Sequence, residues 1–165
     1  MRAPAPWSPE LKQLAARSFL PALCLALSLA AHATPPEACK LVKIEDLNQI
    51  AGGAITGTQV RKAGNPTECS FVDARKASVL VLRLNEVQYA AENELQHERE
   101  TLEKIYRQKA KWVNTVGESS FWLDANKQLV FRKGKTLVWV TFERPANRNE
   151  LDSEQVARLV EAQLK

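Results

Sequence analysis

Residues 77–87 read ASVLVLRLNEV, and this stretch decides the fold class of the chain. Leucine recurs at every second position, as Leu80, Leu82 and Leu84, while the positions between them carry valine or arginine. Side chains alternate between the two faces of an extended chain, so the leucines share one face. The stretch therefore predicts a β-strand whose leucine face belongs to the core.

Shorter strand patterns lie on both sides of this stretch. They occupy residues 55–62, 68–74, 119–123, 128–132 and 136–143. The turns between neighbouring patterns are short, and strands joined by short turns pair antiparallel. Residues 136–143 (TLVWVTFE) are apolar on both faces, so we expect this strand near the middle of the sheet, with Val138, Val140 and Phe142 in the core.

Apolar residues recur at helical spacing in three further segments, residues 41–51, 88–111 and 152–164. The middle segment has a sparse apolar stripe, so much of that helix is expected to face water. Together these patterns predict an α+β fold in the order α-βββ-α-βββ-α, with one antiparallel sheet of about six strands and helices mainly on one face. The other face, with Val79, Val81, Leu137 and Trp139, would then need a cover from a dimer partner, a ligand or a long loop.

Residues 1–33 have the three parts of a cleaved secretion signal. A basic start precedes the apolar run 18–31, and Ala31-His32-Ala33 matches the small-residue rule for cleavage. A membrane anchor is the alternative reading, but a span needs roughly 20 apolar residues and this run is shorter. We therefore expect no transmembrane anchor and one mature domain, residues 34–165, in a bacterial periplasm or secreted.

Loss of the signal changes the charge and chemistry of the chain. The signal contains three cations (Arg2, Lys12, Arg17) and one anion (Glu10), so the net charge falls from +4 to +2. Such a weakly basic exported domain is a poor candidate for nucleic-acid binding.

Two cysteines remain, Cys39 and Cys69, and cysteine pairs in exported domains usually form disulfides. The loop closed by this bridge would stabilise the fold by roughly 3.5 to 4 kcal/mol in the chain-entropy model. A redox or metal role is the alternative, but the cysteines lack C-x-x-C spacing, and His97 is the single mature histidine. We predict no metal, no cofactor and no catalytic residues.

Basic residues gather at the expected turns, and tryptophans occur in neighbouring strands. If the hairpin ends meet, they would form a positive rim for an anionic envelope component. The simpler explanation is that turns are solvated and solvated residues are often charged. The candidate interaction residues are Arg61, Lys62, Arg75, Lys76, Trp122, Arg132, Lys133, Lys135 and Trp139.

Several short features resemble small exported bacterial domains of unknown function. Such domains open with Cys-Leu and a short helix ending in glycine, have a second cysteine in an early strand, and later a Val-Gly turn before an aromatic strand. The matching residues here are Cys39 to Leu41, Ile44 to Gly52, Cys69 to Phe71, Val116 to Glu118, Phe121-Trp122 and Leu129 to Gly134. The resemblance implies a non-enzymatic α+β domain.

The sequence therefore favours a non-enzymatic exported binding or accessory domain. Its partner would be an envelope protein, a second copy meeting the sheet face, or an anionic envelope component. Two alternatives remain open. One is a carrier that holds a small apolar ligand between the sheet and the long helix, and the other is a hydrolase whose carboxylate site the sequence does not mark.

Overall fold

The computed structural model describes residues 37–88, 91–143 and 150–164. The predicted signal, residues 1–33, lies outside these ranges. The elements are η1 (Ala38–Lys40), α1 (Ile44–Ala51), β1 (Gly57–Lys62), β2 (Thr67–Val72), β3 (Ser78–Glu86), α2 (Ala91–Tyr106), β4 (Lys111–Val113), β5 (Ser119–Leu123), η2 (Asp124–Asn126), β6 (Gln128–Lys133), β7 (Thr136–Phe142) and α3 (Glu150–Glu161).

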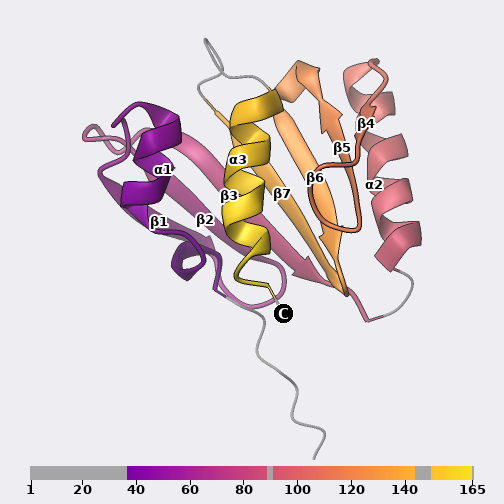
Figure 1. Ribbon diagram of the computed structural model, residues 1–165, viewed down its shortest axis with the longest axis horizontal. Coiled ribbons are helices and arrows are strands. Elements are labelled where there is room, and N and C mark those ends of the chain that lie inside the picture. Colours follow the sequence, from indigo (N-terminus) through magenta and orange to yellow (C-terminus); the bar gives the residue numbers. More distant parts are fainter. Residues whose placement is uncertain (1–36, 89–90, 144–149, 165) are drawn as a thin grey trace, which may run out of the picture. The chain divides into compact units, whose positions relative to one another are not determined.

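The described strands form one seven-stranded antiparallel sheet in the order β1-β2-β3-β7-β6-β5-β4 (Figure 1). β1 to β3 form one meander and β4 to β7 another. The two meanders join where β3 pairs with β7, from Leu80 opposite Phe142 to Glu86 opposite Thr136. The predicted α+β class, the single antiparallel sheet and the central position of the 136–143 strand are confirmed.

The sheet has seven described strands and not about six, because β4 forms where the end of the long helix was predicted. The helix stops at Tyr106, and Arg107 adopts a positive φ of 52° that turns the chain. Lys111–Val113 then pairs with β5, with Trp112 opposite Phe121. The second block is therefore four strands long, and the order α-βββ-α-βββ-α is wrong at this point.

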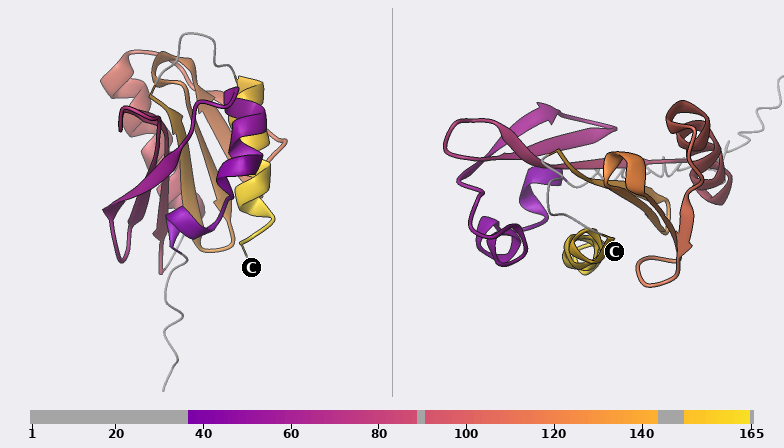
Figure 2. Two further views of the ribbon diagram at one scale, coloured as in Figure 1. Left: turned by 90° about the vertical axis from the view of Figure 1, so that its left-hand side faces the viewer. Right: turned by 90° about the horizontal axis from the view of Figure 1, so that it is seen from above.

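The helices lie on both faces of the sheet. Figure 2 shows α1 and α3 on one face and α2 on the other, over the β5–β7 half. On the α2 face Leu95 is fully buried and packs in a cluster with Phe121, Val130, Leu137 and Trp139. Helices α1 and α3 share one face, as predicted. The long helix α2 does not, and it covers much of the face that was expected to be open.

The larger core lies between the sheet and helices α1 and α3. The leucine face of β3 contributes Leu80, Leu82 and Leu84 to it, as the alternation predicts. A disulfide joins Cys39 of η1 to Cys69 of β2, with the two Cα atoms 5.1 Å apart. The predicted bridge is confirmed, and it fixes the start of the domain to the sheet.

Candidate functional site

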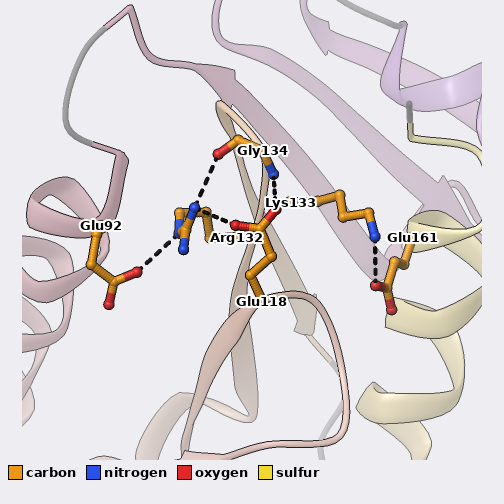
Figure 3. Close-up of polar contacts among 6 residues, drawn as sticks. All are labelled: Glu92, Glu118, Arg132, Lys133, Gly134 and Glu161. Carbon is orange, nitrogen blue, oxygen red and sulfur yellow. Dashed lines mark hydrogen bonds and ion pairs between the residues drawn. The ribbon is translucent and has the colours of Figure 1, made fainter.

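Three of the seven basic residues predicted to form a rim, Arg61, Arg132 and Lys133, are paired with carboxylates. Arg61 donates two hydrogen bonds to Glu143, at 2.9 and 3.1 Å. The guanidinium of Arg132 contacts Glu92 at 3.0 Å and Glu118 at 2.5 Å (Figure 3). These cations are therefore held by the domain itself.

Lys133 is paired more loosely, since its Nζ lies 3.4 Å from Glu161 of α3. Lys62, Lys135, Arg75 and Lys76 make no ion pair within the described residues. Of all the predicted basic residues, these four are therefore the least constrained.

The predicted surface residues do not gather at one place. The 63–66 turn and the β6–β7 turn share one end of the sheet, because Asn65 binds the carbonyl of Glu86 and Val87 N–H donates to the carbonyl of Lys135. Residues 73–77, with Arg75 and Lys76, form the turn at the opposite end.

The two tryptophans proposed for the same surface are also separated. Trp122 packs in the core beneath α1 and α3, and Trp139 packs beneath α2, with 5% of each side chain exposed. The nine predicted residues are therefore distributed over both ends and both faces of the sheet.

A groove of about 240 Å³ lies on the sheet face that α2 covers, at the border between the strands beneath α2 and the β1–β3 half of the sheet. Its floor contains Glu68, Arg83 and Trp139, which stand directly opposite one another on β2, β3 and β7. The wall formed by α2 contains Glu98 and Tyr106. The groove combines both signs of charge with aromatic surface, and we take it as the candidate binding site.

Trp139 lies at the centre of the groove, between two opposite charges. Its indole Nε1 donates a 2.8 Å hydrogen bond to Glu98 of α2. The guanidinium of Arg83 lies over the ring, 4.7 Å from its centroid. The indole is thus fixed by the helix at its edge and stacked by a cation on its face, a cation–π geometry.

Arg83 makes no ion pair within the described residues, although three carboxylates line the same groove. Glu68 stands directly opposite Arg83 in the register, yet its carboxylate lies 3.7 Å from Arg61. Glu143 likewise binds Arg61 with both oxygens. The guanidinium N–H groups of Arg83 therefore make no hydrogen bond to any described residue.

A short chain of amides and a hydroxyl crosses the floor. Asn126 donates to Gln128 at 3.2 Å, and Gln128 donates to the hydroxyl of Thr141 at 2.8 Å. The Oδ1 atom of Asn126 is buried and accepts no hydrogen bond from any described residue. Buried polar atoms are normally paired, so a buried water molecule would satisfy this oxygen.

Glu143 is held in its charged form. Burial opposes the ionisation of Glu143, but hydrogen bonds from Arg61 and Ser78 outweigh it, and the pKa of Glu143 is lowered. The hydrogen bond to Glu143 raises the pKa of Arg61. A general acid needs a raised pKa, so Glu143 is suited to an ion pair and not to proton donation.

The structure also locates the residues considered for other chemistry. His97 is exposed on α2. Within the described residues no cluster of three or more His, Cys, Asp or Glu side chains could hold a metal ion. None of the helices in the described ranges is long and apolar enough to cross a membrane. The space between the sheet and α2, where an apolar ligand was one alternative, is filled by residues that include Leu95, Phe121 and Trp139.

Of the residues that line the groove, the sequence pattern marks Val81 and Trp139, both on the sheet face that was predicted to need a cover. Arg83 had a visible signal, because it is the one charged residue among the apolar positions 79–84. Glu98 had none, since it is one of several glutamates in a charged helix. Comparison with protein-family models, curated proteins and solved structures finds no match to this chain.

Proposed function

We propose that the protein is a non-enzymatic exported binding domain, and that the groove beside α2 holds a small zwitterionic or peptide-like ligand. The observation that carries this proposal is the Arg83–Trp139–Glu98 arrangement. A cation without an ion-pair partner and a carboxylate flank one indole ring at the centre of the groove. This geometry supports a ligand that presents an acceptor to Arg83 and a donor to Glu98.

The polar atoms of the groove match the ends of a short peptide. A carboxylate can accept two parallel hydrogen bonds from a guanidinium such as that of Arg83. An ammonium or amide N–H group can donate to the carboxylate of Glu98. The volume of about 240 Å³ suits an amino acid or the terminus of a peptide and is below the range of drug-sized ligands.

Binding is favoured over hydrolysis by the state of Glu143. The hydrogen bond from Arg61 is among the contacts that lower the pKa of Glu143 and favour its carboxylate form. A glycosidase-like pair would need one protonated acid at neutral pH. Export is supported by the signal-like residues 1–33 and is consistent with the Cys39–Cys69 disulfide.

The test is an NMR titration that follows the indole N–H resonance of Trp139. The probe is tri-alanine with free termini, compared with tri-alanine that is acetylated and amidated. We expect a saturable shift with the free peptide and binding about tenfold weaker with the blocked one, because charge-assisted hydrogen bonds are lost.

The variant Arg83→Met removes the cation and keeps an apolar stem against Trp139. The matched control is Arg75→Met, which removes one cation from the turn at residues 73–77. Arg83→Met should abolish the shift and Arg75→Met should preserve it. Absence of any saturable shift, or an equal loss in both variants, would overturn the proposed ligand class.

A further inference from the structure

A second surface, which meets the groove at Tyr106, lies where α2 ends and β4 begins. Residues 104–112 read KIYRQKAKW and contain four cations and no acid. Among the described residues, five large apolar side chains are exposed, and three of them, Ile105, Tyr106 and Trp112, fall in this segment. Exposed apolar and aromatic groups interleaved with cations are typical of surfaces that meet a lipid interface.

The segment is held in one shape by Glu103. This carboxylate accepts hydrogen bonds from Arg99 at 2.9 Å, from Lys109 at 2.9 Å and from the backbone N–H of Ala110 at 3.0 Å. The hydrogen bond from Lys109 is the largest cause of a lowered pKa at Glu103, so the carboxylate stays charged near neutral pH. The surface is therefore preorganised and needs no folding step to bind.

Three of the four cations line a hollow of about 380 Å³ at the C-terminal end of α2, together with Arg99, Glu100, Glu103 and Gln108. The fourth, Lys111, pairs with Glu150 at 2.9 Å. Lys104 and Arg107 line it and make no ion pair within the described residues. Lys109 also lines it and is 90% exposed although it contacts Glu103. The Nε atom of Arg99 is buried there without a hydrogen-bond partner in the described part of the chain.

We propose that this surface, residues 104–112, docks the protein onto a bilayer that contains anionic phospholipids. The phosphate of a headgroup would enter the hollow between Lys104 and Arg107, with Ile105 and Trp112 against the interface. A free anion would explain the cations but would leave the exposed apolar side chains without a role. The proposal does not rest on the groove ligand, although Tyr106 borders both sites.

The test is cosedimentation of the purified protein with vesicles. One set is phosphatidylcholine alone, and the other is phosphatidylcholine mixed with phosphatidylglycerol. We expect binding to the mixed vesicles, little binding to the neutral ones, and a decrease as salt is raised, because exposed charges are screened. Trp112 should contribute a blue shift in fluorescence on binding.

The double variant Lys104→Glu/Arg107→Glu should weaken binding to the mixed vesicles at least about tenfold, since each cation near an anionic surface contributes roughly a factor of five. The control Arg75→Glu/Lys76→Glu makes the same change in net charge. It is also matched in backbone, because Arg107 and Lys76 both have positive φ, at 52° and 63°. The control should bind like the natural protein.

Ile105→Ser tests the apolar part and should weaken the binding that remains at high salt. Circular dichroism and thermal unfolding of each variant establish that it is folded. Equal loss in both double variants would overturn the proposal, because binding would then depend on net charge alone. Failure to bind any vesicle would also overturn it. This includes the result that inorganic phosphate shifts the NMR resonances of Lys104 and Arg107 while the protein does not sediment with vesicles, because the site would then bind a free anion only.

Discussion

Arg132 and Lys133 are consecutive residues of β6, and their side chains pair with helices on opposite faces of the sheet. Arg132 contacts Glu92 of α2 and Glu118, while Lys133 contacts Glu161 of α3 (Figure 3). The alternation of a β-strand thus makes one dipeptide a link to both helical layers.

Replacing Arg132 with methionine should lower the free energy of unfolding by about 1 to 2 kcal/mol, because a partly buried cation with two carboxylate partners is lost. Lys133→Met is the matched control. It should cost less than about 0.5 kcal/mol, since Lys133 has a single and longer contact and its own side chain is more exposed than that of Arg132. Urea unfolding of the two variants measures the difference, and equal losses would contradict the assigned role of Arg132.

Gly117→Ala should be strongly destabilising. Gly117 has φ +66°, and a Cβ there would overlap the backbone carbonyl of Arg132 and lie 2.9 Å from a ring carbon of Phe131. We expect a loss of about 2 to 4 kcal/mol from strain and overpacking together. Gly134→Ala is the control, because Gly134 also has positive φ, at +56°, but has nothing within 4 Å of the added carbon. It should cost about 1 to 2 kcal/mol in thermal unfolding.

The disulfide should contribute about 3 to 4 kcal/mol, as the chain-entropy model gives for a loop of this length. Cys39→Ala/Cys69→Ala should lose that amount in urea unfolding under oxidising conditions. Thiol titration of the denatured mature protein should find no free thiol. Two titratable thiols would show that the bridge does not form in solution.

Stability should depend on Glu103 in a way that changes with pH. The folded-state pKa of Glu103 lies below its ordinary value of 4.5. Its stabilising contribution is therefore complete above about pH 4.5 and is lost as the pH falls through the folded-state pKa. Glu103→Gln should be less stable than the natural protein at neutral pH, and the difference should shrink in acid. A difference that stays constant from neutral to acid pH would contradict this assignment.

The sequence predicts the fold best where one periodicity dominates. The leucines of β3 and the apolar run of β7 identify core strands, and the cysteine pair predicts a real bridge. β4 is not predicted from the sequence, because its three residues lie in a basic segment and show no alternation of polar and apolar side chains. The end of α2 also escapes it, because Arg107 turns the chain without glycine.

The candidate site could be predicted only in part, for a related reason. The pattern in α2 predicts that Leu95 and Leu102 face the protein, and they are buried and partly buried, but it does not say which face of the sheet they pack against. That choice depends on a connection that carries the chain from β3 at the centre to β4 at the far edge. Glu98 meets Trp139 across 41 residues of sequence because of this crossing. Local periodicity cannot predict a contact between residues so far apart in the sequence.

The join between β3 and β7 has a consequence for how the chain finds its structure. Each meander can form from strands that are neighbours in sequence. The β3–β7 pairing instead places Leu82 opposite Val140, across a segment that includes α2 and three other strands. Closing a long loop costs entropy before its contacts form, and such nonlocal pairing slows folding. The two meanders are thus expected to form early. Pairing of β3 with β7 is then expected to be the slow, rate-limiting step of folding.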